Sequence, residues 1–321
     1  MHKLTVAIGL AVASLMNVHA ANAQSYPTKP VRVLVTSTAG GPLDVFTRLV
    51  TNKMEQRLKQ PFVVENRFGA GGHLAVTTAL QAPPDGHTIL FSIDTTFTVN
   101  PSVFRQIPFD PDKDLIPISV LAKVGQALVV RPDLPVNSVN DLQALSLQKD
   151  INYGSAGTGT PSHLSFSYLQ AATGIRATHI PYRGNPPALL ALTGGDTQAS
   201  MVISTSILAL AKEGKLKVLA YSDRTRSEVI PDVPTFAEQG LKDFEIVFSY
   251  VLLVRSGTPQ HIVDTLLEEA TRAVMSPDVR EALRSVDTVP IALSPSDSVA
   301  WLHTNRAKWK NVVSQMNIRF D

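Results

Sequence analysis

Short apolar runs rich in β-branched residues alternate with stretches of helical spacing along most of the chain. The run VRVLV at residues 31–35 is followed by a small polar loop and then by helical periodicity up to residue 58. PFVVEN, HTILFSI and ALVVRP begin further units of the same kind. Buried strands that alternate with helices predict an α/β fold with parallel or mixed sheets.

The second half of the chain restarts this alternation and ends in helical segments near residues 259–275, 277–286 and 296–313. Two long β-rich runs, LIPISVLAKVGQALVVRP and FEIVFSYVLLVRSG, flank the middle section. If both runs cross between two lobes, residues 24–124 and 236–321 form a discontinuous lobe 1 and residues 125–235 form lobe 2. Such a pair of crossings lets the cleft between the lobes close by hinging.

The N-terminal segment has the pattern of a secretory signal peptide. Lys3 precedes an apolar run over residues 4–16, and Ala21-Asn22-Ala23 gives a small-residue cleavage site. This pattern predicts a signal peptide over residues 1–23, cut after Ala23, and its apolar run is too short to span a bilayer. We therefore expect export, and no later stretch has the ~18 consecutive apolar residues of a transmembrane helix.

Composition narrows the function classes. The 29 Lys and Arg residues nearly balance the 27 Asp and Glu residues, which argues against a nucleic-acid-binding surface. The chain has no cysteine, and its histidines lack metal-ligand spacing, so we expect neither a thiolate nor a metal site. The Gly157-Thr158-Gly159 segment lacks the rest of a dinucleotide fingerprint and no G-x-S-x-G elbow is present, so neither a dinucleotide site nor a hydrolase nucleophile at Ser155 is predicted. A catalytic triad assembled from distant residues stays open at this point.

Two loops share one layout in opposite halves of the chain. TSTAGGPLD (36–44) and GSAGTGTPSH (154–163) each follow a strand, carry only small residues and reach a proline. Proline favours the first helical position, so Gly41 and Thr160 are predicted caps. Helix starts offer free N–H groups and a positive dipole end, which suit an anion such as a carboxylate. The predicted ligand-binding residues in these loops are Ser37, Thr38, Ala39, Gly40, Gly41, Leu43, Asp44, Ala156, Gly157, Thr158, Gly159, Thr160 and His163.

Asp44 and His163 occupy equivalent places, two residues after the proline. Asp44 is expected either to cap its own helix or to hold an ordered water that donates to the ligand. For His163 we favour ordering of the loop, with direct ligand contact as the alternative.

Other strand-to-helix loops supply further candidates for the cleft. Tyr182, Arg183 and Gly184 open one of them, where the guanidinium would suit a second acid group, or else lie at the surface. The polar residues after two apolar strands, Thr95, Thr96, Ser204 and Thr205, either line the cleft or form ordinary turns.

The chain resembles the substrate-binding proteins of tripartite tricarboxylate transporters, the Bug-type periplasmic receptors. The likeness extends over nearly all of the chain after residue 23 and rests on YPTKPVRVLV, AGGPLD, VVENRFGAGG, PPDGHTILF, PFDPDKDLIPIS, YGSAGTGTPSHLS, HIPYRGNPPAL and PDVPTFAEQG. It implies a two-lobed type II periplasmic binding protein that is not an enzyme and has no cofactor, and that passes a small carboxylate to integral membrane permease subunits. It also implies that the AGGPLD and SAGTGTPSH loops pinch the carboxylate, often through ordered water.

Because of two departures from the family pattern, the identity of the ligand cannot be taken over from a relative. Thr36-Ser37-Thr38-Ala39 replaces the usual Pro-Phe segment, and Phe248-Ser249-Tyr250 stands where a tryptophan is usual. We expect a monomer that binds a mono- or dicarboxylate, aliphatic or aromatic. The alternatives are a receptor that feeds a sensor pathway and an exported α/β hydrolase.

Overall fold

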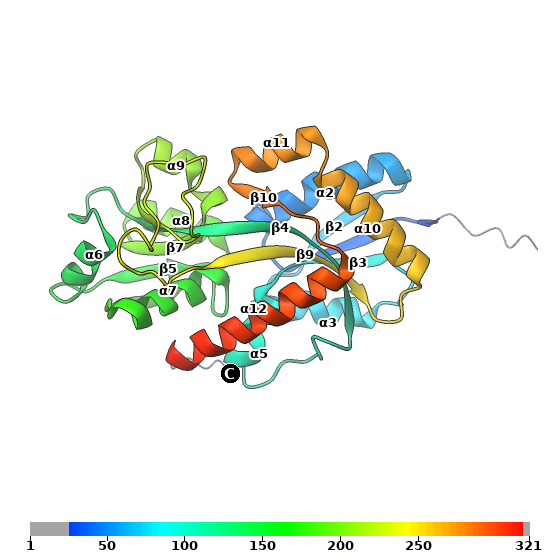
Figure 1. Cartoon of the computed structure of the whole chain (residues 1–321), viewed down its shortest axis with the longest axis horizontal. Coiled ribbons are helices and arrows are strands. Elements are labelled where there is room, and N and C mark those ends of the chain that lie inside the picture. The colour runs from blue at the N-terminus through cyan, green and yellow to red at the C-terminus, as the bar shows by residue number, and fades with distance from the viewer. Residues whose placement is uncertain (1–25, 317–321) are drawn as a thin grey trace, which may run out of the picture.

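A computed structural model describes residues 26–316 of the protein. The predicted signal peptide lies outside the described residues. Two α/β lobes stand side by side, with the strands β4 and β9 running between them (Figure 1). The two-lobed fold with crossing strands, predicted from the sequence, is confirmed.

Lobe 1 holds the N-terminal end of the described chain and most of the helices, and its last helix, α12, extends from it to lobe 2 (Figure 1). Its elements are β1 (Val31–Val35), α2 (Pro42–Leu58), β2 (Phe62–Asn66), η1 (Ala70–Gly72), α3 (His73–Gln81), β3 (Thr88–Ile93), α4 (Thr95–Thr98), α5 (Asn100–Val103), the first part of β4 (Leu115–Val130), β9 (Val247–Arg255), α10 (Gln260–Val274), α11 (Pro277–Ser285), β10 (Thr288–Pro290) and α12 (Pro295–Met316).

Lobe 2 is built from the middle of the chain. Its elements are the end of β4, α6 (Val139–Ser146), β5 (Asn152–Ser155), α7 (Pro161–Thr173), β6 (Thr178–Pro181), α8 (Asn185–Gly194), β7 (Ala199–Ile203), η2 (Ser204–Ser206), α9 (Leu208–Lys212) and β8 (Lys217–Tyr221).

One mixed sheet continues through both lobes in the order β2-β1-β3-β9-β4-β7-β5-β6, with β8 and β10 also paired to β4. β1 lies between β2 and β3, parallel to both, and β5 lies between β6 and β7 in the same way. The two predicted loops therefore leave equivalent interior strands. Burial on both faces explains why β1 is apolar at nearly every position.

The strand β4 changes partners halfway along its length. From Leu115 to Gly125 it pairs with β9, and from Gln126 to Val130 it pairs with β7 and β8. The residue at this change of partners is Gly125. A larger residue would clash there, because a Cβ would lie 2.2 Å from the hydroxyl of Tyr221. The lobe boundaries given from the sequence stay a prediction, and the first of them, after residue 124, falls beside this point.

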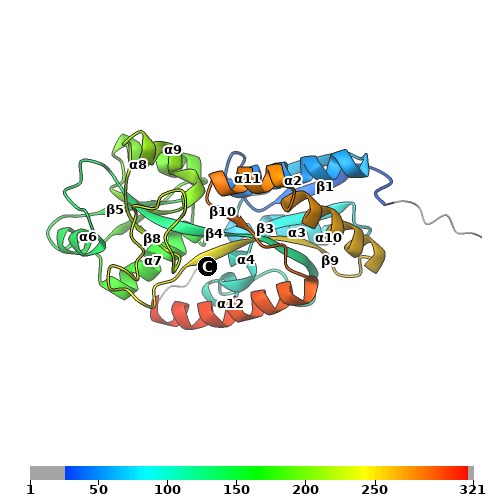
Figure 2. The same ribbon diagram turned by 45° about the horizontal axis from the view of Figure 1, so that its top comes forward.

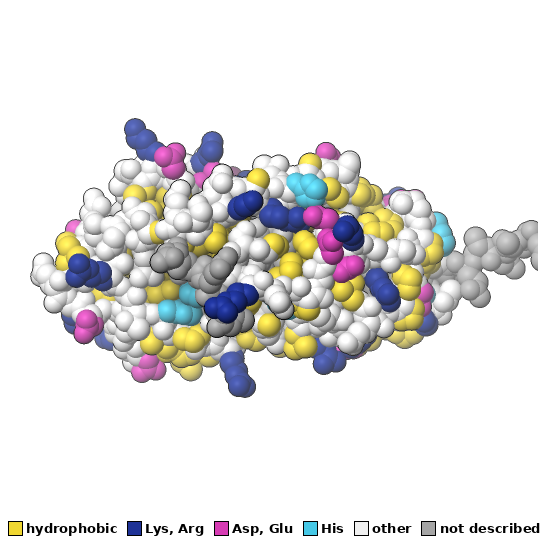
Figure 3. All heavy atoms as spheres, turned by 90° about the horizontal axis from the view of Figure 1, so that it is seen from below, with side chains coloured by type: hydrophobic (Ala, Val, Ile, Leu, Met, Phe, Trp, Pro, Cys, Tyr) yellow, Lys and Arg dark blue, Asp and Glu magenta, His cyan; other side chains and the backbone are white. Residues whose placement is uncertain are grey.

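Helices cover the sheet and also join the lobes. α10 and α11 lie along α2 on one side of lobe 1 (Figure 2). α12 packs on β4 and α4 and reaches α7 of lobe 2, where the rings of Tyr168 and Trp309 are 6.4 Å apart. Within residues 26–316, no helix has the length and apolar character needed to cross a membrane. The face in Figure 3 carries separated charges of both signs on a largely neutral surface.

Candidate functional site

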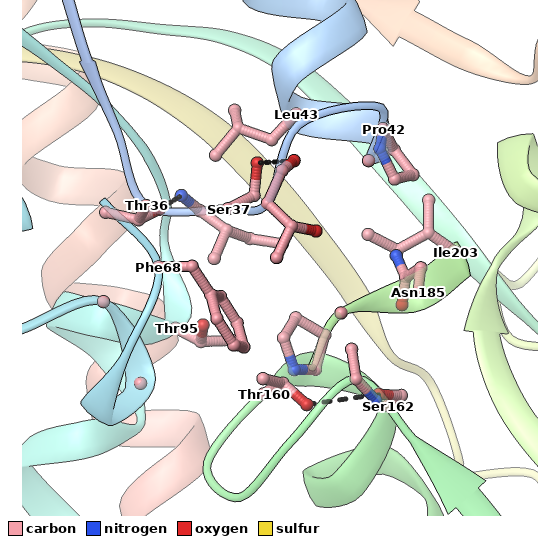
Figure 4. Close-up of a pocket in the computed structure, with 18 of the residues that line it drawn as sticks. Thr36, Ser37, Pro42, Leu43, Phe68, Thr95, Thr160, Ser162, Asn185 and Ile203 are labelled. Carbon is pink, nitrogen blue, oxygen red and sulfur yellow. Dashed lines mark hydrogen bonds between the residues drawn. The ribbon is translucent and has the colours of Figure 1, made fainter. Parts of the chain in front are cut away.

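A small cavity of about 70 Å³ lies between the lobes, where the loops after β1 and β5 face each other (Figure 4). It is lined from lobe 1 by Thr36, Ser37, Thr38, Gly41, Pro42, Leu43, Phe68, Gly71, Gly72, Ile93 and Thr95, and from β4 and lobe 2 by Gln126, Ala156, Gly159, Thr160, Pro161, Ser162, Gly184, Asn185 and Ile203. Among these described residues none has a charged side chain, so any charge on a ligand would be met by neutral dipoles.

The β1–α2 loop ends in a tight turn before the helix. The N–H of Gly41 donates to the carbonyl of Thr38 at 3.2 Å, and Gly40 has a φ of +74°. Gly41, the cap of α2, has φ −75° and ψ 163°, and the N–H of Val45 donates to its carbonyl at 3.0 Å. A left-handed glycine at residue 40 lets the loop turn sharply into Pro42.

The β5–α7 loop repeats this geometry in lobe 2. The N–H of Thr160 donates to the carbonyl of Gly157 at 3.3 Å, and Gly159 has the same φ of +74° as Gly40. Thr160 caps α7 with φ −80° and ψ 161°, and the N–H of Leu164 donates to its carbonyl at 3.0 Å. The internal likeness seen in the sequence is thus a likeness of backbone conformation.

Asp44 and His163 accept equivalent hydrogen bonds from the backbone of their loops. The N–H of Gly40 donates to Oδ2 of Asp44 at 2.9 Å, and the N–H of Gly159 donates to Nδ1 of His163 at 3.2 Å. Both side chains are buried and neither lines the cavity. The expectation that His163 orders its loop agrees with this contact, and Asp44 has the same part in the first loop.

Asp44 and His163 are each held in the protonation state in which the side chain accepts the hydrogen bond from its loop. Burial alone would raise the pKa of Asp44, but hydrogen bonds from Arg48, Gly40 and Asn66 outweigh burial and keep it below its usual value. Burial, together with the neighbouring His179, lowers the pKa of His163 to about 3. At neutral pH Asp44 is therefore ionised and His163 is uncharged.

The helix starts can bind an anion in the cavity. Proline at residues 42 and 161 has no N–H, and the next residues of the two helices, Leu43 and Ser162, line the cavity. Their N–H groups have no acceptor within a helix, and the dipole ends of α2 and α7 face the cavity from opposite lobes (Figure 4). The arrangement suits one carboxylate held from both sides.

The lobes touch around this cavity. A Cβ on Gly184 of lobe 2 would lie 2.4 Å from Oγ1 of Thr38, and a Cβ on Gly159 would lie 2.9 Å from the ring of Phe104. A Cβ on Gly157 would lie 3.4 Å from the ring of Phe68. Gly184 and Gly159 of lobe 2 thus allow close contact with lobe 1, whereas a Cβ on Gly157 would make an ordinary van der Waals contact. The structure shows the cleft closed.

The structure brings part of the predicted residue set to the cavity. The predicted residues in its lining are Ser37, Thr38, Gly41, Leu43, Thr95, Ala156, Gly159, Thr160 and Gly184. Those outside the lining are Ala39, Gly40, Asp44, Thr96, Gly157, Thr158, His163, Tyr182, Arg183, Ser204 and Thr205.

Several of the residues outside the lining have other contacts. Arg183 is exposed. Thr96 donates to the carbonyl of Gly71 at 3.1 Å, and Ser204 donates to that of Gly125 at 3.4 Å. Thr205 lines a second, larger cavity of about 670 Å³ between α2, α8 and α11, in which Gly40 also takes part.

Sequence reasoning missed other residues of the lining. Phe68, Gly71 and Gly72 come from the loop after β2, whose glycines read as an ordinary turn. Asn185 opens α8, and its place after the predicted Gly184 was a usable signal. Gln126 lies within an apolar strand and gave no local signal.

Ser155 and His179 form a pair that bears on the hydrolase alternative. Oγ of Ser155 lies 2.6 Å from Nε2 of His179 and also accepts from the N–H of Gly157 at 3.1 Å. Ser155 is completely buried and is not part of the cavity lining. The pair therefore holds the loop in shape and does not present a nucleophile. Within residues 26–316, no group of three or more His, Asp or Glu side chains is placed to hold a metal.

Comparison with known proteins shows the family to which the chain belongs. The profile of the tripartite tricarboxylate transporter family receptor matches residues 46–318. The chain belongs to this family. Its members are substrate-binding receptors, so the expectation that the chain is not an enzyme is confirmed.

Relatives extend over almost the whole receptor. BugT of Bordetella pertussis is 29% identical and covers 98% of each chain. MatC from Rhodopseudomonas palustris, solved with bound malate, is 31% identical, covers 90% of this chain and 100% of its own, and has a TM-score of 0.85. A protein of R. palustris solved with adipate is 29% identical, covers 92% and 99%, and has a TM-score of 0.88. The likeness to Bug-type receptors is thereby confirmed.

Proposed function

We propose that the receptor captures a small carboxylate, aliphatic or aromatic, in the periplasm by closing its two lobes and delivers it to the membrane subunits of a tripartite tricarboxylate transporter. The observation that carries this proposal is the pair of matched helix starts, α2 from lobe 1 and α7 from lobe 2, on one cavity. Because each lobe supplies half of the donors, the carboxylate binds the closed form better than the open form.

The two relatives solved with ligands support the carboxylate class, since one holds malate and the other adipate. The uncharged lining is compatible with this class, because main-chain N–H groups at helix ends bind anions without a cation. Periplasmic location rests on the predicted signal peptide, residues 1–23. We propose that the receptor acts as a monomer, with the permease subunits as its partners and no nucleic acid.

A thermal-shift screen tests the ligand class. The chain from residue 24 onwards is heated with succinate, glutarate, adipate, malate, benzoate and terephthalate, and with glucose and ethylamine as uncharged and cationic controls. A ligand present at 100 times its Kd stabilises the folded state by about 2.7 kcal/mol. We expect at least one carboxylate, and neither control, to raise the Tm. A flat response to every carboxylate would contradict the proposal.

Separate experiments test the proposed role in transport. Deletion of the gene should abolish uptake of the carboxylate identified in the screen, and the purified receptor with that ligand should retain the permease subunits in detergent. Loss of a transcriptional response without loss of uptake would indicate a sensor receptor instead.

A further inference from the structure

Gln126 is a lining residue with a buried side-chain amide that has no hydrogen-bond partner among the described residues. It is completely buried, and neither Nε2 nor Oε1 of its amide has a hydrogen-bond partner among the described residues. A buried amide without partners is costly in a folded protein, and such groups are nearly always satisfied. Gln126 is also part of the lining of the cavity between the lobes, so we take a ligand bound in that cavity as the missing partner.

The backbone of Gln126 is fixed at the junction of the lobes. Its N–H donates to Oγ of Ser222 at 2.7 Å, and the N–H of Ser222 donates back to its carbonyl at 2.9 Å. Oγ of Ser222 in turn donates to the carbonyl of Ile246 at 2.5 Å, just before β9. These bonds tie together the crossing segments, and they leave only the side-chain amide of Gln126 without a partner.

The amide differs from the carboxylate-binding loops in what it can recognise. Helix starts only donate, whereas a carboxamide donates through Nε2 and accepts through Oε1. A carboxylate facing Gln126 would use the donor but place a second negative charge against Oε1. It would also be desolvated in a lining that contains no cationic side chain. A hydroxyl or a carboxamide both accepts and donates, so it satisfies both atoms of Gln126.

Resting on the carboxylate-binding function above, we propose that Gln126 selects ligands that carry one carboxylate and, at the other end, an uncharged group that both donates and accepts a hydrogen bond. The matched loops hold the carboxylate, and the amide of Gln126 holds the hydroxyl or carboxamide. The receptor therefore prefers such a ligand to the dicarboxylate of the same length.

Calorimetry with matched ligands tests the preference. The Kd is measured at pH 7.5 for the diacid, its monoamide and the simple monoacid at three chain lengths, together with an aromatic set. The sets are succinate, succinamate and butyrate; glutarate, glutaramate and pentanoate; adipate, adipamate and hexanoate; and terephthalate, terephthalamate and benzoate. In the set that binds tightest, we expect the monoamide to bind at least tenfold more tightly than the diacid. A diacid that binds as tightly as the monoamide would overturn the proposal.

Substitution of Gln126 tests the residue itself. In Gln126→Leu, the affinity for the monoamide should fall at least tenfold, while that for the simple monoacid should stay the same or rise. Gln126→Glu adds a carboxylate and should weaken the diacid more than the monoamide. Gln239→Leu is the matched control, because that amide is fully engaged, with Nε2 donating to Leu219 and Oε1 accepting from Val139. It should leave the order of the ligands unchanged.

The stability of the ligand-free variants separates recognition from folding. Gln126→Leu removes a buried amide without partners, so its Tm should equal or exceed that of the wild type, whereas Gln239→Leu should lower the Tm. Equal monoamide affinity in Gln126→Leu and the wild type would refute the role of Gln126 while leaving the carboxylate function intact. If the wild type binds none of the acids, both the proposed function and this inference fail.

Discussion

Gly184 of lobe 2 lies directly against the side chain of Thr38 in lobe 1. A Cβ at Gly184 would come within 2.4 Å of Oγ1 and 2.9 Å of Cγ2 of Thr38. Only a hydrogen atom fits between the α-carbon and the threonine in the closed cleft. Closure of the lobes therefore depends on this glycine.

Gly184→Ala should weaken binding of the carboxylate at least tenfold, a change of about 1.4 kcal/mol, because the methyl group keeps the lobes apart. Titration calorimetry measures the loss. Gly184 also has a φ of +106°, so part of any effect on the Tm comes from backbone strain.

Gly240→Ala is the matched control for that strain. Gly240 has a φ of +97°, and a Cβ there would meet nothing within 4 Å. Gly240→Ala should lower the Tm by about as much as Gly184→Ala does and leave the affinity for the carboxylate unchanged. Adding Thr38→Ala to Gly184→Ala should restore part of the affinity, and equal affinities in all three variants would contradict the closure argument.

Gly40 and Gly159 allow a second comparison at equivalent positions. Both have a φ of +74°, so Gly→Ala imposes the same backbone strain at each, of order 1–2 kcal/mol. A Cβ at Gly159 would lie 2.9 Å from the ring of Phe104 across the cleft, whereas a Cβ at Gly40 would meet nothing within 4 Å.

Gly159→Ala should therefore reduce affinity several-fold more than Gly40→Ala, measured against the same ligand. Substitution of Gly40 acts through its backbone conformation and not by blocking space. A larger loss from Gly40→Ala would show that Phe104 gives way without cost and that the first loop is the more sensitive one.

The buried His163 should make stability depend on pH. Its pKa is lowered to about 3 in the folded protein, against a usual value of 6.5, so the unfolded chain binds the proton more readily between these values. Its contribution to stability is complete above pH 6.5 and is lost as the pH falls toward 3. At pH 5 this loss is about 2 kcal/mol relative to pH 7.5.

Urea unfolding at pH 7.5, 6 and 5 measures this dependence in the wild type and in His163→Asn. Asparagine does not titrate, and its Oδ1 can accept from the N–H of Gly159 as Nδ1 does. The variant should lose less stability than the wild type on acidification. Parallel curves for the two proteins would mean that His163 is already accessible to protons in the folded state.

Asp94 should show a pH dependence of the opposite sign. It lies at the end of β3 and is buried, which raises its pKa to about 7 although Ser249 donates to it at 2.6 Å. The folded state then binds the proton more readily than the unfolded chain. The stabilisation that Asp94 contributes is complete below pH 3.8, the usual pKa of an aspartate, and is lost as the pH rises toward 7.

Asp94→Asn removes the titration and keeps an acceptor for Ser249. The free energy of unfolding of the variant minus that of the wild type should therefore increase from pH 4 to pH 7, by up to about 1.4 kcal/mol per pH unit. Chemical denaturation at both pH values measures the difference. A constant difference across this range would show that Asp94 titrates normally.

The two loops were predictable from sequence because their signals are local. Small residues followed by proline mark a helix start, and the repeated layout pointed to Asp44 and His163 as equivalent residues. Arg183 was the weaker prediction, since a charge suggests an anion partner but the sequence does not say which side of a loop faces the cleft. The structure leaves Arg183 exposed while its neighbour Gly184 lines the cavity.

The sequence by itself determined the alternating α/β units, the two crossing runs and the helix starts, because each depends on the periodicity or the backbone preferences of neighbouring residues. Only the tertiary structure decided that Gln126 lies in the cavity. One glutamine in an apolar strand has no local signal, and its place between the lobes depends on where β4 changes strand partners, next to Gly125. Contacts such as Gly184 with Thr38 join residues far apart in the chain, and no short-range pattern encodes them.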